Sequence, residues 1–434
     1  MAVSWVILVI LVLNVVLVTS SPTPVNNYQV LAGHQVWRTE GEREAAAVMG
    51  RLEREGLVDV LGHGTVSAVR VFPESKDVVS ASLRREGIKY QVVIPDLRSH
   101  FAEERRRVKK ELLSSRQMET CLESDCPKPL TQRYMTFPEM EWYLHDLKAR
   151  YSRVELKSIG KTFENRDIWM VHIKPTAARG TIKRDAIWIE GGIHAREWIS
   201  EAVTLQLLDR LAADNTSLTR NIDIYSVPIV NPDGYEYSRT TNRMWRKNRS
   251  IDPSVRQDCP GVDLNRNWDE GYGVGASTNP CSDTYQGRNP FSELETRALK
   301  KEMERVSSTN NFRLVMAVHS YGQKLYYPWG YTREKAPYTA EMKSAGEAFA
   351  QAASVRGRGR RGTQYEVTSS SDLYLASGAT DDWSKGALNV KYVYTLELPD
   401  EGFHGFALPP SHIKSASRDV WRGLKKLIPL AREK

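Results

Sequence analysis

The spacing of hydrophobic positions changes along the chain, and residues 28–102 form its first distinct part. Alternating polar and apolar residues predict a strand at 65–72, and short apolar runs at 36–37 and 90–94 predict further strands. Residues 42–55 are rich in helix-forming side chains. The first part is therefore expected to be a small α+β unit.

After Tyr134 the pattern becomes a long alternation of buried strands and helices. Apolar runs predict buried strands, and stretches rich in helix formers predict helices. The expected strands are 185–190, 223–230, 313–319 and 392–398, and the expected helices are 198–211 and 292–306. Ser292 and Glu295 form a capping-box pattern at the start of the second helix. This alternation predicts a parallel or mixed sheet covered by helices.

An apolar run at residues 5–18, interrupted only by Asn14, precedes both parts. A membrane-spanning helix needs about 20 apolar residues, so the run is too short for an anchor. It is typical of a secretory signal with cleavage after Ser20. We therefore expect a secreted protein without a membrane anchor.

The segment 101–116 is strongly charged and includes Arg105-Arg106-Arg107. It is either a solvated helix face or a connection that trypsin-like proteases cut, with Arg116 as one candidate bond.

Composition narrows the class of protein. Hydrophobic residues make up 41% and charged residues 26%, and there are four Cys, which excludes a wholly disordered chain and a disulfide-dense mini-scaffold. The 61 Lys and Arg against 53 Asp and Glu give +8, spread along the sequence. The Arg-rich tract 356–361 is a solvated loop, an anionic-surface contact or a processing site. It lacks interleaved aromatic residues, so we expect no nucleic-acid partner.

Candidate chemistry begins where the strand 185–190 ends. His194 and Glu197 are three residues apart, so one turn can direct an imidazole and a carboxylate to one point, as zinc ligands do. His319 closes another buried strand and is followed by Ser320-Tyr321-Gly322. Sites in open α/β sheets form at this edge, which makes His319 the candidate third ligand.

Seven segments in this order resemble the secreted zinc metallocarboxypeptidases of the pancreatic carboxypeptidase A/B type. They are 194–197, 231–234, 243–247, 261–268, 319–321, Tyr374 with 381–383, and 395–398. The resemblance covers nearly all of the chain after the signal. It implies a mixed eight-stranded α/β sheet with helices on both faces, preceded by a small α+β ferredoxin-like prodomain.

The resemblance also implies roles for individual residues. His194, Glu197 and His319 would hold one zinc ion, and Asp263 would orient a zinc histidine. Glu397 would act as general base and then acid, and Arg246 would stabilise the oxyanion.

Recognition of a free C-terminal carboxylate is implied for a second group of residues. Asn265 and Arg266 would bind the carboxylate, and Tyr374 would close over the substrate. Other residues would line the approach, namely Arg196, Ser320, Tyr321 and Phe406.

Asp381 carries the expectation about specificity. In the family, the residue at this position lies at the base of the side-chain pocket, and Asp there accompanies a preference for C-terminal Lys or Arg. The next residue, Asp382, is general to the family and is expected to be structural. This chain departs from the family at Ala379, where Gly is usual, and by one extra residue between Trp383 and Glu397. An apolar C-terminal preference is the alternative, and a catalytically silent binding protein is a further one.

The implied organisation is a monomeric zymogen. Residues 1–20 would be the signal, 21–116 an activation prodomain that inhibits the enzyme, and 117–434 the catalytic domain. Its partners would be an activating trypsin-like protease and the C-termini of proteins or peptides.

Cysteines and sequons complete the expectations. The family has a disulfide at Cys259–Cys281, which would leave Cys121 and Cys126 for a local bridge. Asn215 and Asn248 both begin glycosylation sequons, of which Asn215 is the more favourable because Asn248 is two residues from Arg246.

Overall fold

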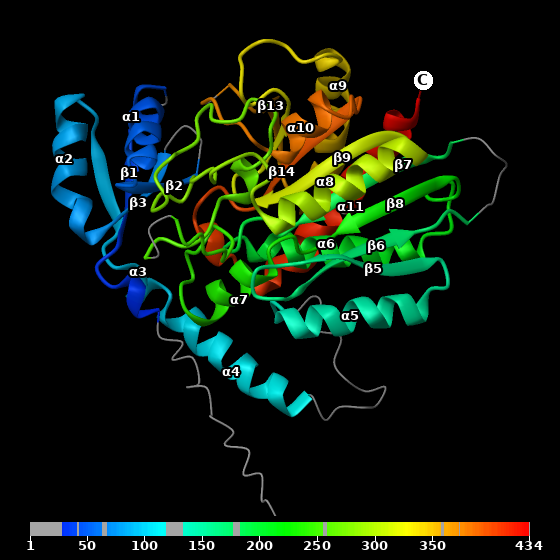
Figure 1. The fold of residues 1–434 in the computed structure, drawn as a ribbon, viewed down its shortest axis with the longest axis horizontal. Coiled ribbons are helices and arrows are strands. Elements are labelled where there is room, and N and C mark those ends of the chain that lie inside the picture. Colours follow the sequence, from blue (N-terminus) through cyan, green and yellow to red (C-terminus); the bar gives the residue numbers. More distant parts are fainter. Residues whose placement is uncertain are drawn as a thin grey trace, which may run out of the picture.

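The computed structural model describes residues 28–40, 43–62, 67–118, 133–176, 183–254, 258–356, 360–372 and 374–433. A small N-terminal domain packs against the side of a larger α/β domain, and helix α4 leads away from the small domain (Figure 1). No described helix is both long and apolar enough to cross a membrane. The expected signal segment, Cys121 and Cys126 lie outside the described residues.

The N-terminal domain is a four-stranded antiparallel sheet in the order β2-β3-β1-β4. Its elements are β1 (Gln35–Thr39), α1 (Arg43–Arg54), β2 (Val58–Gly62), β3 (Ser67–Val71), α2 (Lys76–Arg85) and β4 (Tyr90–Ile94). Helices α1 and α2 pack on one face through a cluster that includes Met49, Val69 and Leu83. The β-α-β-β-α-β order is ferredoxin-like, which confirms the expected fold of this unit.

The larger domain is built on an eight-stranded mixed sheet in the order β13-β10-β14-β9-β7-β8-β6-β5. The strands are β5 (Val154–Lys161), β6 (Asp167–Ile173), β7 (Asp185–Gly191), β8 (Ile222–Val227), β9 (Asn311–Ser320), β10 (Lys324–Tyr327), β13 (Glu366–Ser369) and β14 (Tyr392–Leu398). The central strands β14, β9, β7 and β8 are parallel, and their continuous apolar runs are buried on both faces.

Helices cover both faces of this sheet, as expected. One face packs against α5 (Phe137–Arg150), α6 (Trp198–Ala213), α9 (Thr339–Ser354) and α11 (Ile413–Arg432). The other packs against α8 (Leu294–Thr309) and α10 (Thr380–Gly386). The remaining elements are α3 (Leu97–His100), α4 (Ala102–Met118), α7 (Pro232–Thr240), β11 (Val355–Arg356), β12 (Arg360–Arg361), and 3₁₀ turns at Gln29–Leu31, Pro73–Ser75, Leu264–Arg266, Gly405–Ala407 and Pro410–His412.

The expected capping box at Ser292 is wrong. Helix α8 begins at Leu294, and its N-cap Glu293 makes no side-chain cap bond. The Ser292 hydroxyl instead accepts a hydrogen bond from Asn267 Nδ2 at 2.9 Å. A capping box does occur at the start of α5, between Thr136 and Glu139. The competing tertiary bond therefore decided where the cap formed.

The charged segment after residue 101 forms helix α4, but it is not a purely solvated face. Glu104 is buried, and its Oε2 accepts a hydrogen bond from Arg243 Nε in the larger domain at 2.8 Å. The backbone of Arg116 lies within α4. The helix thus also connects the two domains.

The two sequons differ in accessibility, and this yields a test. Asn248 is 0% exposed, and its Nδ2 donates to Glu293 at 2.7 Å and to Glu295 at 3.2 Å. Asn215 is exposed in the loop after α6.

We expect protein secreted from eukaryotic cells to carry a glycan at Asn215 and none at Asn248, because glycosylation requires an accessible amide. Peptide mass spectrometry of wild type and N215Q measures this, and N215Q should lose the entire glycan mass. A glycan on Asn248 in folded protein would contradict the prediction.

Candidate active site

The turn after β7 positions the first two candidate ligands. β7 ends at Gly191, and Gly192 adopts φ +64°, where a Cβ would lie 2.7 Å from Glu201 Cγ. The following residues carry His194 to the end of the sheet, and Glu197 is the N-cap of α6. Glycine is required here for both its backbone angle and its small size.

His194, Glu197 and His319 converge on one point. The Nδ1 of His194 lies 2.8 Å from Glu197 Oε1, and the Nδ1 of His319 lies 3.1 Å from Glu197 Oε2. The two Nδ1 atoms are 3.1 Å apart. One donor atom from each residue falls within 4.8 Å of the others, and all three residues are buried. Two imidazole nitrogens and a carboxylate oxygen are the donor set that catalytic zinc prefers.

The electrostatics of this cluster also fit a bound cation. Burial alone would raise the pKa of Glu197, but the imidazoles of His194 and His319 hold it below its usual range. The carboxylate is therefore ionised at neutral pH. A buried pair of nitrogens and an anionic oxygen aimed at one another suit a metal ion, and the residues present fit zinc.

Asp263 lies directly behind the cluster. Its Oδ1 is 3.1 Å from His194 Nε2, which leaves Nδ1 directed at the ligand point. Its Oδ2 accepts hydrogen bonds from Arg246 Nε and Nη2 at 3.0 and 2.9 Å. Burial would raise the pKa of Asp263, but Arg246 and His194 lower it well below its usual value. One carboxylate thus fixes both an imidazole and a guanidinium.

Glu397 is brought beside the cluster by strand register. It pairs with His319 across the parallel strands β14 and β9. Burial raises the pKa of Glu397 to about 8, although His319 opposes this. Its Oε2 is buried and has no hydrogen-bond partner among the described residues. A buried carboxylate oxygen in that condition is available to a ligand.

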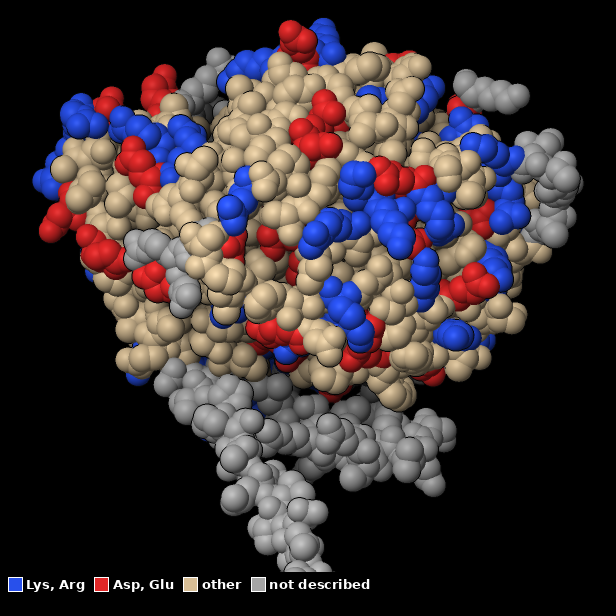
Figure 2. All heavy atoms as spheres, in the orientation of Figure 1, with Lys and Arg blue, Asp and Glu red and all other residues tan. Residues whose placement is uncertain are grey.

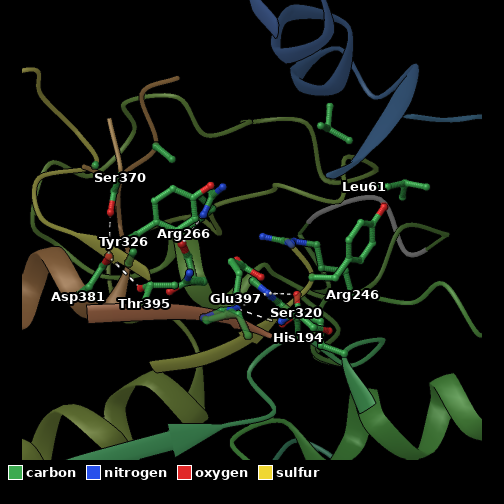
Figure 3. Close-up of a pocket in the computed structure, with 18 of the residues that line it drawn as sticks. Leu61, His194, Arg246, Arg266, Ser320, Tyr326, Ser370, Asp381, Thr395 and Glu397 are labelled. Carbon is green, nitrogen blue, oxygen red and sulfur yellow. Dashed lines mark hydrogen bonds and ion pairs between the residues drawn. The ribbon is translucent and has the colours of Figure 1, made fainter. Parts of the chain in front are cut away.

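The remaining predicted residues line the same cleft (Figure 3). These are Arg196, Arg246, Asn265, Arg266, Ser320, Tyr321, Tyr374, Asp381 and Phe406. Arg266 Nη1 donates to the Asn265 carbonyl at 2.8 Å, and Arg266 Nε has no partner among the described residues. Burial raises the pKa of Tyr374, and the nearby Arg266 opposes this rise.

Outside the cleft, the expected Cys259–Cys281 disulfide is present.

Asp381 lies at one end of the cleft, and its oxygens are already positioned (Figure 3). Oδ2 accepts hydrogen bonds from Thr395 Oγ1 at 3.0 Å and Ser370 Oγ at 3.4 Å. Oδ1 accepts the backbone N–H of Asp382 at 2.9 Å. The residue is 5% exposed, and no Lys or Arg of the described chain pairs with it. A carboxylate with hydroxyl partners and no cation suits a cationic ligand.

Asp382 has a different environment, which fits the expected structural role. Its carboxylate accepts the backbone N–H groups of Gly330 and Tyr331 at 2.9 to 3.0 Å. The departure at Ala379 causes no backbone strain, because φ there is −100°.

Trp383 lies in α10 and Glu397 in β14, and residues 387–391 connect these two elements. The register of Glu397 with His319 is intact.

The N-terminal domain also contributes residues to this cleft, which sequence patterns did not predict. Val60 and Leu61 of β2 are among the lining residues, and Figure 3 shows Leu61 on the blue segment above the site. Asp59 forms an ion pair with both terminal nitrogens of Arg196. The sequence offered one signal for this contact, because Asp59 is a charged residue inside the otherwise apolar run 58–61.

The ion pair belongs to a buried crossed cluster between the domains. Arg70 lies 3.4 Å from Asp59 and 2.8 Å from Asp283 of the larger domain. Each domain therefore supplies one Arg and one Asp. All four side chains are at most 10% exposed.

Ser370 and Thr395 were also missed, although Thr395 carried a signal. It precedes Glu397 by two residues in one strand, so both side chains face the same side of the sheet. Ser370 comes from the segment after β13 and could not be located without the fold.

The sequence is similar to known proteins over most of its length. A family model described as zinc carboxypeptidase matches residues 140–423. Carboxypeptidase A1 of Rattus norvegicus is 36% identical over 408 residues, which cover 90% of this chain and 92% of the relative. Carboxypeptidase A2 of Rattus norvegicus is 34% identical over 379 residues, which cover 85% of each.

Solved structures agree with this similarity. Carboxypeptidase A from Helicoverpa armigera matches with a TM-score of 0.79 and 26% identity, covering 93% of this chain and 98% of that one. Thrombin-activatable fibrinolysis inhibitor matches with a TM-score of 0.73 and 26% identity, covering 93% and 100%.

Removing the charge of Asp263 tests the metal site. We expect D263N to bind zinc about 10- to 100-fold more weakly, because the carboxylate orients His194 through Nε2. Zinc affinity is measured by competition with a chelator on the full chain. D209N, on the exposed side of α6, is the matched control and should bind zinc as wild type does. Unchanged zinc affinity in a folded D263N would contradict the prediction.

Proposed function

The chain belongs to the zinc carboxypeptidase family, and from that premise we propose that it removes C-terminal Lys or Arg from proteins and peptides. The coarser function follows from membership: it is a metallocarboxypeptidase, a hydrolase that acts on peptide C-termini. Specificity, residue roles and regulation are the proposed parts. The observation that carries the specificity is the Asp381 carboxylate in the cleft, which is hydrogen-bonded but has no ion-pair partner among the described residues.

His194, Glu197 and His319 would hold the zinc ion through His194 Nδ1, His319 Nδ1 and the Glu197 carboxylate. Bound zinc supplies Lewis acidity, which lowers the pKa of water and polarises the scissile carbonyl. Glu397 Oε2 accepts a proton from the attacking water and passes it to the leaving amine nitrogen as the C–N bond breaks. Within the described part of the chain this oxygen has no other partner, which supports that role.

Arg246 stabilises the negative charge that develops on the attacked carbonyl oxygen. Asp263 engages Nε and Nη2 of the guanidinium, so Nη1 remains for the substrate. Because Asp263 holds the group in place, little reorganisation is needed when the charge forms.

Arg266 and Asn265 bind the free C-terminal carboxylate, which limits attack to the last peptide bond. A guanidinium can bond a carboxylate with two parallel N–H groups, and Arg266 Nε has no partner among the described residues. Tyr374 lies at the same part of the cleft and covers the bound end of the substrate.

Asp381 then pairs with the departing side chain. The residues that line the cleft include the small residues Gly330, Ala376 and Ala379, which leave room for a long Lys or Arg side chain. A buried anion that no described Lys or Arg pairs with favours such a partner and disfavours an apolar one, because the apolar side chain leaves the carboxylate without a cation.

The N-terminal domain is proposed to keep the enzyme latent. Residues 21–116 would form the prodomain, 117–434 the catalytic domain and 1–20 a removed signal of a secreted zymogen. Asp59 occupies Arg196 at the approach to the cleft, and Leu61 lines the same cleft. A trypsin-like protease would release the enzyme by cutting near the end of α4, with Arg116 as a candidate bond.

The specificity is tested with peptides that differ only in their C-terminal residue: Lys, Arg, Phe or Leu. We expect wild type, activated with trypsin, to prefer Lys and Arg. D381N should lose at least about 30-fold in kcat/KM for these two, because about 2 kcal/mol or more accompanies loss of a buried charge partner.

Two comparisons make that result decisive. E397Q should be inactive on every peptide, which assigns the measured hydrolysis to this site. D381N should lose little on Phe and Leu, because these side chains gain nothing from the carboxylate. A wild-type preference for Phe would overturn the assignment in favour of the apolar alternative.

Latency is tested by changing Asp59 in the intact, uncut chain. We expect D59N to hydrolyse a C-terminal Lys peptide at least about tenfold faster than uncut wild type, because Arg196 and Arg70 lose their shared carboxylate. D77N, exposed on α2, is the control and should stay latent. Equal basal rates in folded D59N and wild type would contradict the proposed inhibition.

A further inference from the structure

Two segments of the larger domain carry a local surplus of positive charge. Helix α11 contains six Lys and Arg and one Asp, a balance of +5. Residues 355–361 contain four Arg and no acidic residue, a balance of +4. Together they carry +9, whereas the whole chain carries +8. The rest of the sequence is therefore close to neutral.

The residues that flank β11 and β12, Ala353 and Thr363, contact α11. The carboxylate Oδ2 of Asp419 in α11 accepts the N–H and hydroxyl of Thr363, both at 2.8 Å. Arg422 Nη2 donates to the carbonyl of Ala353, at the end of α9, at 3.2 Å. The β11–β12 hairpin is thus held against α11 at both of its ends. Among its arginines, the side chain of Arg361 is exposed.

The cations of α11 form one row along the helix. Lys414, Arg418, Arg422 and Lys425 are separated by four, four and three residues, which places them on one side. At about 1.5 Å per residue the row extends about 16 Å. Residues of the opposite side, such as Val420, Leu424 and Leu427, are fully buried. We call this row, with Arg210 of α6, the α11 basic face.

The α11 basic face has almost no internal counter-charge. Lys414, Arg418 and Lys425 form no ion pair within the described part of the chain. Burial and the nearby Arg418 lower the pKa of Arg210, so like charges are crowded there.

The acidic residues nearest to this face are already engaged. The neighbour of Arg210, Asp209, pairs with Arg150 at 2.8 Å. Asp419 is buried and bonded to Thr363 and Arg422.

Helix α8, on the opposite side of the sheet, provides a contrast (Figure 1). There Lys157 pairs with Glu302, and Lys300 pairs with Glu304, both at 2.5 Å. Figure 2 shows Lys and Arg gathered beside Asp and Glu over this region. Three cations on the α8 side, Lys157, Lys300 and Arg305, are ion-paired, whereas three of the four cations in the α11 row form no ion pair among the described residues.

We propose that the α11 basic face binds a linear sulfated polysaccharide, such as an extracellular protein would meet. Guanidinium and ammonium groups in a row match sulfate groups repeated along a chain. A membrane is disfavoured, because none of the exposed large apolar side chains of the described residues belongs to α6 or α11. Nucleic acid is disfavoured because the face presents no exposed aromatic ring for base stacking. None of its residues lines the catalytic cleft.

The experiment measures binding of a heparin octasaccharide to the full-length protein at 0.15 M NaCl by calorimetry, with salt elution from immobilised heparin. The triple variant K414Q/R418Q/K425Q removes three unpaired cations and keeps good helix formers. We expect it to bind at least about tenfold more weakly and to elute at lower salt.

A matched variant on the other side of the sheet, R297Q/K300Q/K301Q, removes the same charge from α8. We expect less than twofold loss, with unchanged thermal stability and unchanged peptidase activity after trypsin in both variants. Equal losses in the two variants would overturn the proposal, since net charge alone would then explain binding. Absence of heparin binding by wild type would also overturn it. So would equally tight, equally α11-dependent binding to phosphatidylserine vesicles or duplex DNA.

Discussion

The register of the parallel strands at the centre of the sheet is the constraint on which the site depends. Glu397 of β14 lies opposite His319 of β9, and β7 ends beside Val318, one residue earlier in β9. Three strands distant in sequence thus end at one level, and the turn after β7 brings His194 and Glu197 to the same point. A shift of one residue in any of these strands would turn its side chain to the opposite face of the sheet. The apolar core on both faces fixes that register, so the catalytic geometry is a consequence of core packing.

Burial of charge is the second organising feature, and it is balanced locally. Asp263 is fully buried because it serves His194 and Arg246 at once, and loss of either partner would leave an uncompensated anion. The domain interface follows the same rule with its crossed cluster of two Arg and two Asp. Arg196 takes part in both settings, since it lines the cleft and binds Asp59. In the proposed zymogen, one carboxylate of the N-terminal domain would meet a cation that lines the cleft, so latency would need no separate device.

The parts predictable from the sequence were those with local signals. Continuous apolar runs identify buried strands such as 392–398 in the sequence. The spacing of His194 and Glu197 identifies them as candidate ligands, because one turn of the chain can bring both side chains to one point. The cap at Ser292 failed because Asn267, 25 residues away, competes for the same hydroxyl. Ser370 and Asp59 reach the site through tertiary packing and interdomain contact, which no local pattern encodes. Only the folded structure shows that these two residues contact the site.

The overall charge of the chain and its proposed specificity have opposite signs, and the structure accounts for this. Charges in water are screened over about 8–10 Å, so a surplus on α11 has little effect inside the cleft. Asp381 is 5% exposed at one end of the cleft and would act on a bound side chain at contact distance, where one charge outweighs many distant ones. A protein of net +8 can therefore favour a cationic C-terminus, because its surface cations and its buried anion would contact different partners. The net charge of this chain thus reflects its surface residues, whereas the proposed specificity depends on one buried carboxylate.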